Sequence, residues 1–269
     1  MYILFDIGGT KMRFARSADL RSFSKTIIKP TPNTYAPTIV EIKLILDELR
    51  EGNKITAMVG GIAGVLSEDD NTLFASPNLA EFVKKPIVKD LERISGAKVK
   101  LFNDAELAGL GEATFGAGYD YDIVAYLTIS TGIGGALIIN KQIAKNKFGF
   151  EPGHQILNYK TGDTFEDLLG GNSLQEKYNL HPKQLPKDLY NGELANIATV
   201  GVHNVIQMWS PDVVVMGGSQ MNDLSVDLIK ENLDILNRMF PDTPDITLAK
   251  LGSENGLYGA MSIAKMMKK

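Results

Sequence analysis

The chain has 269 residues, of which 44% are hydrophobic and 22% are charged, and its formal net charge is −4. This composition is that of an ordinary globular protein, and the length suits two compact domains of about 100 to 150 residues each. Acidic residues outnumber Lys and Arg, which argues against nucleic acid as a partner, and the absence of cysteine excludes disulfides, thiolate metal sites and cysteine nucleophiles.

The N-terminal residues 1–6 contain neither a basic segment nor a small-residue cleavage site. We therefore expect a cytoplasmic protein without a secretory signal. The longest uncharged stretch, residues 123–140, reaches the length of about 18 residues at which a membrane span becomes conceivable. Its middle, residues 130–135, reads Ser-Thr-Gly-Ile-Gly-Gly, which favours two strands around a turn. No association with a membrane is expected.

The first half of the chain begins with an apolar run at residues 2–5 that ends in a turn at 6–10. Apolar alternation then resumes at Met12 and Phe14, which predicts a β-hairpin. The other predicted elements are a third strand at 24–28, a loop with Pro30, Pro32 and Pro37, a helix with the apolar face Ile39, Ile42, Leu46 and Leu49 closed by Gly52, a strand at 55–59, a helix at 86–95, a strand at 99–102 and a helix at 105–114.

The second half repeats this order of elements. Residues 123–129 and 133–139 predict another hairpin, and a short third strand follows near 142–144. The segment 145–189 interrupts the repeat and is interpreted as an insertion. The remaining predicted elements are a helix at 193–209, a strand at 213–216, a helix at 225–237, a strand at 246–249 and a helix at 256–268.

Two halves with the same element order predict a duplicated α/β fold, with β-β-β-α-β-α-β-α in each half and a cleft between two domains. We expect a smaller N-terminal domain over residues 1–104, against which the C-terminal helix 256–269 packs. The larger domain is expected over 105–255 and includes the insertion 145–189.

Each half opens with a glycine turn, residues 6–11 (Asp-Ile-Gly-Gly-Thr-Lys) and residues 128–135 (Thr-Ile-Ser-Thr-Gly-Ile-Gly-Gly). Neither turn matches G-x-x-x-x-G-K-[ST] or G-x-G-x-x-G. Glycine permits positive φ and has no Cβ, so successive N–H groups can converge on an anion, and Asp6 could hold a hydrated Mg²⁺. A single Gly-Gly turn is ordinary hairpin structure. Two such turns in corresponding places indicate a nucleotide phosphate site.

Five segments, in the same order as in the family, resemble the ROK group of sugar kinases and sugar-responsive repressors within the actin-like ATPase superfamily. The resemblance implies two actin-like ATPase (ribonuclease H-like) domains and an ATP-dependent kinase that acts on a hexose or N-acetylhexosamine, with the 6-hydroxyl as the expected acceptor. Members are often homodimers. The segments are Asp6-Ile7-Gly8-Gly9-Thr10-Lys11, Asn103-Asp104-Ala105, Ser130-Thr131-Gly132-Ile133-Gly134-Gly135, Glu151-Pro152-Gly153-His154 and Gly217-Gly218.

Asp104 resembles the family's catalytic base, which accepts the proton of the attacking sugar hydroxyl. The alternative interpretation is that Asp104 is the N-cap of the helix predicted at 105–114. The two interpretations are compatible, because the positive end of a helix would keep the carboxylate ionised and fix its direction. We expect both.

The resemblance also implies a sugar site made of carboxylate, imidazole and amide groups, which can reject epimers by leaving a buried polar group unpaired. Most members bind a structural zinc through cysteines that follow the Glu-Pro-Gly-His segment. This chain has no cysteine, so we expect no zinc and a His154 that faces the sugar. Residues 163–171 resemble zinc-free members instead, with Asp167 as the alternative to Glu166. The implied sugar-binding residues are Asn78, Asn103, Glu151, His154 and Glu166.

ATP and Mg²⁺ are the cofactors that the resemblance implies. Lys11 is equally well explained as a solvated lysine on a hairpin. The glycines that follow the predicted strand 213–216 would form the adenosine-side turn, or alternatively an ordinary strand-to-helix turn. The implied nucleotide-binding residues are Gly9, Thr10, Lys11, Thr131, Gly132, Gly217 and Gly218, and Asp6 would hold Mg²⁺ through water.

Two other functions remain open for the sequence. A sugar-sensing regulator of the same family would carry an N-terminal helix-turn-helix, whereas this sequence begins at the first core strand. Another ATPase of the actin-like superfamily would keep the glycine turns but not the Glu151–His154 segment. Sugar and ATP are therefore the expected small-molecule partners.

Overall fold

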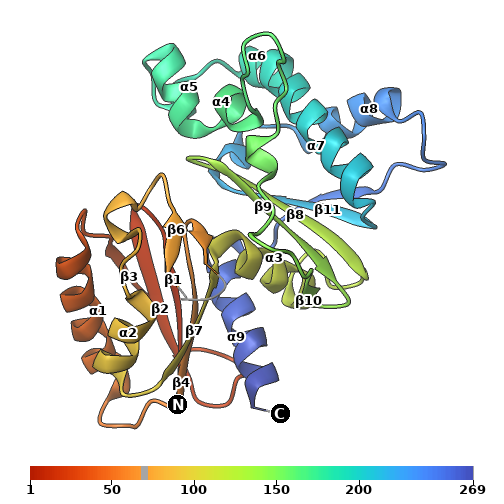
Figure 1. Ribbon diagram of the computed structural model, residues 1–269. Helices are drawn as coiled ribbons and strands as arrows, with labels where there is room; N and C mark the ends of the chain where they lie inside the picture. Colours follow the sequence, from red (N-terminus) through yellow and green to blue (C-terminus); the bar gives the residue numbers. More distant parts are fainter. Residues whose placement is uncertain (68–71, 269) are drawn as a thin grey trace. The chain divides into compact units, whose positions relative to one another are not determined.

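The computed structural model describes residues 1–67 and 72–268, which form two compact units (Figure 1). The first unit comprises Met1–Thr114, Lys145–Gly149 and Ser253–Lys269, and the second comprises Phe115–Ala144 and Phe150–Gly252. Helix α3 (Asp104–Phe115) thus lies almost entirely in the first unit, whereas the boundary expected at residue 104 placed it in the second domain.

The first unit contains a five-stranded sheet in the order β3-β2-β1-β4-β7. Strands β1, β2 and β3 pair antiparallel, and β1, β4 and β7 run parallel. Successive residues of a strand face opposite sides of the sheet, so Ile3 and Phe5 join the core formed with α1 and α2, while Leu4 is buried on the side where α9 contacts β1 and β4. The strands are β1 (Tyr2–Ile7), β2 (Lys11–Ser17), β3 (Ile27–Pro30), β4 (Ala57–Ile62) and β7 (Lys98–Asn103).

Helix α2 of the first unit ends where the sequence predicts. Helix α2 ends at Ser95 because Gly96 adopts a φ of 70° and its N–H donates to the Glu92 carbonyl at 2.8 Å. The other elements of this unit are α1 (Tyr35–Arg50), α2 (Ile87–Ser95), α9 (Asn255–Met267), the short strands β5 (Val65–Leu66) and β6 (Leu73–Ala75), and the 3₁₀ turn Ala80–Phe82.

Helices α3 and α9 meet through glycines. A Cβ on Gly259 would lie well inside van der Waals distance of the Leu107 carbonyl oxygen, and a Cβ on Gly111 would collide with the carbonyl oxygen of Asn255. The two backbones can approach this closely only because both positions lack a side chain. The crossing fixes α3, whose first residue is Asp104.

The second unit repeats the arrangement of the first, with a five-stranded sheet in the order β10-β9-β8-β11-β12. Its core lies between this sheet and the helices, chiefly α7 and α8. The elements are β8 (Ile123–Ile129), β9 (Ile133–Ile139), β10 (Gln142–Ile143), β11 (Val213–Gly217), β12 (Asp245–Leu248), α4 (Phe165–Leu169), α5 (Gly171–Tyr178), α6 (Lys187–Leu189), α7 (Ala195–Trp209) and α8 (Val226–Leu236).

The duplicated α/β core is confirmed, with three antiparallel strands followed by two parallel ones in each sheet. Four local predictions need correction. Pro37 lies in the first turn of α1 rather than in a loop. Strands β3 and β4 lie two to three residues further along the chain than the predicted 24–28 and 55–59. The first two residues of the helix predicted at 193–209 belong instead to a π-helical turn, Tyr190–Leu194, which precedes α7. Strands β5 and β6 had no counterpart in the prediction.

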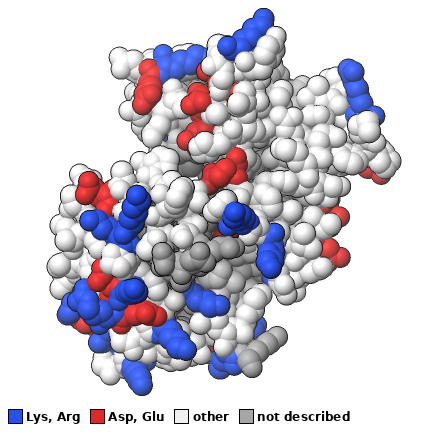
Figure 2. All heavy atoms as spheres, in the orientation of Figure 1, with Lys and Arg blue, Asp and Glu red and all other residues white. Residues whose placement is uncertain are grey.

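The surface carries mixed charge. On the face drawn in Figure 2, the Lys and Arg side chains of the described residues are interspersed with Asp and Glu rather than gathered in one field. Among residues 1–67 and 72–268, no helix is long and apolar enough to cross a membrane.

Candidate active site

The first glycine turn connects β1 to β2 and carries Asp6 at its N-terminal side. Asp6 and Arg13 are paired across the hairpin, and the Nη1 of Arg13 donates to the Oδ2 of Asp6 at 3.1 Å. The turn is closed by Gly8 N–H, which donates to the Lys11 carbonyl at 3.0 Å, and braced by the Thr31 hydroxyl, which donates to the Gly8 carbonyl at 2.7 Å. The conformation of this turn is therefore fixed before any ligand binds.

Asn78 lies directly against the first glycine turn. A Cβ on Gly9 would lie 2.6 Å from the Cβ of Asn78, so a larger residue at position 9 would displace the Asn78 side chain. The main-chain environment of Asn78 is fixed by the Ser76 hydroxyl, which accepts from the Leu79 N–H at 3.1 Å and donates to the Ala63 carbonyl at 2.7 Å. Thr10 and Lys11, on the far side of the turn, are exposed.

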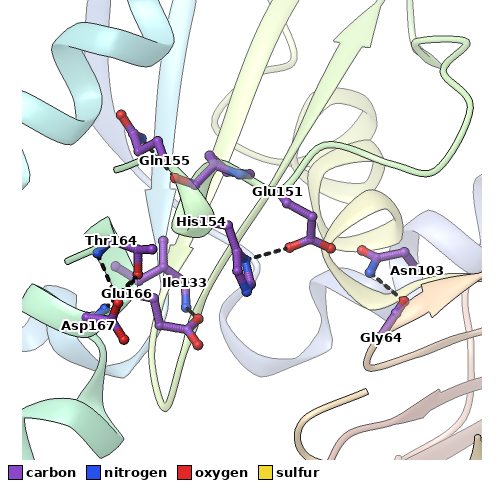
Figure 3. Close-up of polar contacts among 10 residues, drawn as sticks. Gly64, Asn103, Ile133, Glu151, His154, Gln155, Thr164, Glu166 and Asp167 are labelled. Atoms are coloured by element: carbon purple, nitrogen blue, oxygen red, sulfur yellow. Dashed lines mark hydrogen bonds and ion pairs between the residues drawn. The ribbon is translucent and has the colours of Figure 1, made fainter. Parts of the chain in front are cut away.

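Asn103, not Asp104, caps helix α3. The Oδ1 of Asn103 accepts from the N–H groups of Ala105 and Glu106 at 2.8 and 3.1 Å, and its Nδ2 donates to the Gly64 carbonyl at 3.0 Å (Figure 3). The N-cap interpretation of Asp104 is therefore wrong. The Oδ1 of Asp104 accepts from the N–H of the adjacent Ala105 at 2.9 Å.

The carboxylates of Asp6 and Asp104 both lie in the first unit, and the pKa of each is raised. Burial raises the pKa of Asp104, while the hydrogen bond from the Ala105 N–H acts in the opposite direction. Burial and the neighbouring Asp104 charge together raise the pKa of Asp6 to about 6, although Arg13 favours its ionised form. This paired environment is typical of functional rather than surface carboxylates.

The second glycine turn connects β8 to β9 and is bound to the segment that joins α4 and α5. Within the turn, the Ser130 N–H donates to the Gly132 carbonyl at 2.8 Å. The N–H of Gly171 donates to the Ser130 carbonyl at 2.8 Å, and the N–H of Asn172 donates to the Thr131 carbonyl at 3.0 Å. The α4–α5 junction and the turn are thus held as one structural element.

Glu166 and Asp167 have separate environments. Asp167 completes a capping box with Thr164, whose N–H and hydroxyl donate to its Oδ2 at 2.9 and 2.7 Å. Glu166 points to the second glycine turn, where its Oε2 accepts from the Ile133 N–H at 2.6 Å (Figure 3). Because the Asp167 carboxylate is used at the start of α4, Glu166 is the better candidate for a ligand contact.

Glu151 and His154 lie together at a 3₁₀ turn, Pro152–His154. The Nδ1 of His154 is 3.5 Å from the Oε2 of Glu151, and both side chains are exposed (Figure 3). Gln155 holds this turn on helix α7, because its Nε2 donates to the Pro152 carbonyl at 2.9 Å and its Oε1 accepts from the Asn204 amide at 2.8 Å. The sequence motifs gave no indication of Gln155 or Asn204.

A pocket in the second unit lies beside the second glycine turn and the end of β11. Gly218 follows β11 with a φ of 96°, and a Cβ there would collide with the Ile129 carbonyl oxygen. Behind the pocket, the Tyr190 hydroxyl donates to Gln220 Oε1 at 2.7 Å. Thr131 is the one predicted nucleotide-binding residue that lines this pocket. The remaining lining residues were not predicted to bind the nucleotide: Gly171, Asn172, Gln175, His181, Pro182, Lys183, Ser219, Gln220 and Asp223.

The predicted residues therefore form two groups. The first unit brings Asp6, Asn78, Asn103 and Asp104 into the neighbourhood of the first glycine turn, together with Gly9. The second unit brings Glu166 onto the second glycine turn, and Glu151 pairs with His154. Among the described residues, no three His, Asp or Glu side chains are grouped as ligands of a metal ion.

Comparison with known proteins gives a consistent picture. The family model described as "ROK family" matches residues 2–267. A glucokinase of Streptomyces coelicolor is 25% identical over 305 residues, covering 97% of this chain and 96% of that protein. An N-acetyl-D-glucosamine kinase of Pasteurella multocida is 26% identical over 305 residues, covering 96% and 97%. A ROK family glucokinase from Streptomyces griseus, solved with glucose and AMPPNP, has a TM-score of 0.83 and 24% identity, covering 98% and 99%.

Proposed function

Because the chain belongs to the ROK family, we propose that it is an ATP-dependent sugar kinase acting on a hexose or an N-acetylhexosamine, with the 6-hydroxyl as acceptor. The observation that carries the proposal is the half-buried Asp104 carboxylate at the start of α3, in the same unit as a preformed glycine turn. The kinases of glucose and of N-acetylglucosamine among the relatives support the class of substrate.

In the proposed reaction, the Asp104 carboxylate accepts the proton of the sugar hydroxyl. The hydroxyl oxygen forms a bond to the γ-phosphorus of ATP, the bond from that phosphorus to the β,γ-bridging oxygen breaks, and ADP leaves with the bridging oxygen. Asn103 would keep Asp104 in place by holding the first turn of α3. With one Nδ2–H beyond its bond to Gly64, Asn103 would contribute at most a single donor to the sugar.

The phosphates would be bound by main-chain N–H groups and hydroxyls of the two glycine turns, with Lys11 as an added positive charge. The first turn would contribute Gly9 and Thr10, and the second turn Thr131 and Gly132. The nucleoside would occupy the pocket beside Gly217 and Gly218, where amide, hydroxyl and carboxylate groups suit a base and a ribose.

The residues proposed to bind the sugar hydroxyls are Asn78, Glu151, His154 and Glu166. Carboxylates accept, an amide donates and accepts, and an imidazole can do either, which matches hydroxyls that do both. The Asn78 side chain is exposed next to Gly9 and is therefore accessible to a ligand.

Asp6 fits a hydrated Mg²⁺. Its carboxylate oxygen is the ligand type that Mg²⁺ prefers, and the repulsion between Asp6 and Asp104 is of the kind that a nearby cation relieves. Asp6 would hold the ion through water, and the ion would neutralise charge on the ATP phosphates. Arg13 would limit how far the Asp6 carboxylate can turn.

A coupled assay of ADP release with a panel of sugars tests the proposal. We expect release that depends on glucose, mannose, N-acetylglucosamine or N-acetylmannosamine. ATP hydrolysis that is independent of any sugar would favour a different actin-like ATPase. Sugar binding without turnover would favour the regulator.

Glu151→Gln is expected to raise the KM for the sugar about tenfold with little change in kcat, because Glu151 would contact substrate and transition state alike. Steady-state kinetics with varied sugar measures this. Glu231→Gln, a change of an exposed carboxylate on α8, should leave both constants unchanged. A fall in kcat at unchanged KM would contradict the binding role.

The pH dependence of kcat/KM should reflect Asp104, which must be ionised to accept a proton, together with Asp6, whose pKa is raised to about 6. Burial raises the pKa of Asp104, so decreasing the pH protonates it earlier than an ordinary carboxyl group, and kcat/KM should fall on the acidic side. Circular dichroism at each pH would confirm that the fold persists. A profile that remains flat down to about pH 4, the ordinary carboxyl range, would contradict the assignment.

A further inference from the structure

The carboxylate of Glu166 occupies the space beside Gly132 in the second glycine turn. A Cβ on Gly132 would lie 2.5 Å from the Oε2 of Glu166 and 3.0 Å from its Cδ. The same Oε2 accepts from the N–H of the next residue, Ile133, at 2.6 Å (Figure 3). The glycine and the N–H therefore act on the same oxygen, one by leaving room for it and the other by binding it.

The Glu151–His154 segment also rests on strand β9. A Cβ on Gly135 would lie 2.7 Å from the Cγ of Pro152, and a Cβ on Gly153 would collide with the Ile133 carbonyl oxygen. Ile133 thus contacts one candidate sugar-binding segment through its N–H and approaches the other at its carbonyl. The start of β9 is the common support of both segments.

We propose that Gly132 and the main-chain N–H of Ile133 are positioning elements of the sugar site, which set the direction of the Glu166 carboxylate. The proposal rests on the proposed function and assigns the second glycine turn a role toward the sugar in addition to its role toward phosphate. Glu166 remains the residue that contacts the sugar, and the two turn residues act through it.

A methyl group at position 132 should displace the Glu166 side chain rather than the main chain of the turn. A methyl group at position 132 cannot be accommodated by the main chain, because Gly171 and Asn172 hold the turn through two hydrogen bonds. The end of the Glu166 side chain is flexible, so it moves instead and loses the Ile133 N–H. A charge-assisted hydrogen bond would be lost and the carboxylate misdirected, while the fold is retained.

The experiment measures dissociation constants by calorimetry for D-glucose, N-acetyl-D-glucosamine and ADP. The proteins are wild type, Gly132→Ala, Glu166→Ala and the double variant. Gly192→Ala is the matched control, because a Cβ at this position in the same unit has no atom within 4 Å and Gly192 has no positive φ. Melting temperatures show whether each variant is folded.

We expect Gly132→Ala to weaken binding of the preferred sugar about tenfold or more, as for the loss of a hydrogen bond to a charged group, and to change ADP binding much less. In the Glu166→Ala background the same change should have almost no further effect on sugar binding, because Gly132 acts only through Glu166. Gly192→Ala should bind all three ligands as wild type does.

Unchanged sugar affinity in folded Gly132→Ala would overturn the inference. Equal losses of affinity for sugar and for ADP would also overturn it, and so would a double variant in which the effects of the two single changes on sugar binding add up. If Gly132→Ala is unfolded, the binding measurements are repeated with Glu166→Asp, whose shorter side chain cannot span the distance to the Ile133 N–H. Unimpaired sugar binding by Glu166→Asp would then overturn the inference, and a loss comparable to that of Glu166→Ala would support it. The proposed function is refuted instead if wild type binds neither sugar and no sugar of the wider panel, mannose and N-acetylmannosamine included, stimulates ADP release.

Discussion

Asp104→Asn is expected to lower kcat by about 100- to 10,000-fold, which is the usual contribution of a general base. The amide has the same size as the carboxylate, and its oxygen can still accept from the Ala105 N–H as the Oδ1 of Asp104 does. Only the ability to take a proton is lost. The dissociation constant for the sugar should therefore remain within about threefold of the wild-type value, as for a group that acts in the transition state.

Glu106→Gln is the matched control for this prediction. Glu106 is also in the first turn of α3, and burial also raises its pKa, but its side chain accepts from the Asn146 amide at 3.4 Å and has no proposed role in the reaction. We expect near wild-type turnover from it. If Asp104→Asn retains turnover, or if Glu106→Gln loses as much, Asp104 is not the base.

The second hairpin shows which parts of the fold the sequence can predict. Residues 123–129 and 133–139 were predicted to the residue, because a nearly continuous apolar run on each side of a glycine turn marks both strands. Strand β3 was misplaced because it is an edge strand. Its position is set by pairing with β2, where Lys11 pairs with Pro30 and Phe14 with Ile27, and the sequence of an edge strand carries little of that information.

The sequence likewise predicts some of the candidate site residues and not others. Motif resemblance led to Asp104 and Glu166, but it assigned the cap of α3 to Asp104 as well as the role of base, and it could not decide between the adjacent carboxylates Glu166 and Asp167. Those choices depend on side-chain directions: Asn103 takes the cap of α3, and Asp167 takes the capping box of α4. The pocket residues His181 and Asp223 are brought together only by folding of the insertion, so no spacing in the sequence marks them.

Gly259→Ala is expected to damage both stability and turnover, because the added Cβ meets main chain rather than a flexible side chain. It would collide with the carbonyl oxygen of Leu107 in α3, so one of the two helices must shift. Overpacking of this kind should lower the melting temperature by about 5 °C or more. The shift also displaces α3, which begins at Asp104, and a misplacement of about 1 Å can cost 100-fold in rate.

Gly256→Ala, also on α9, separates the effect of the α3–α9 crossing on stability from the effect of helix propensity. A Cβ at this position would lie 3.7 Å from the Cγ of Asp6, which is ordinary contact, and alanine favours a helix by up to about 1 kcal/mol over glycine. Its melting temperature should therefore equal or exceed that of wild type, while Gly259→Ala melts lower. Gly111→Ala, which places a Cβ against the Asn255 carbonyl oxygen from the α3 side, should repeat the Gly259→Ala result. If both close-contact variants melt like wild type and keep full turnover, the α3–α9 crossing does not hold Asp104 in place, and the position of the base depends on Asn103 and strand β7 alone.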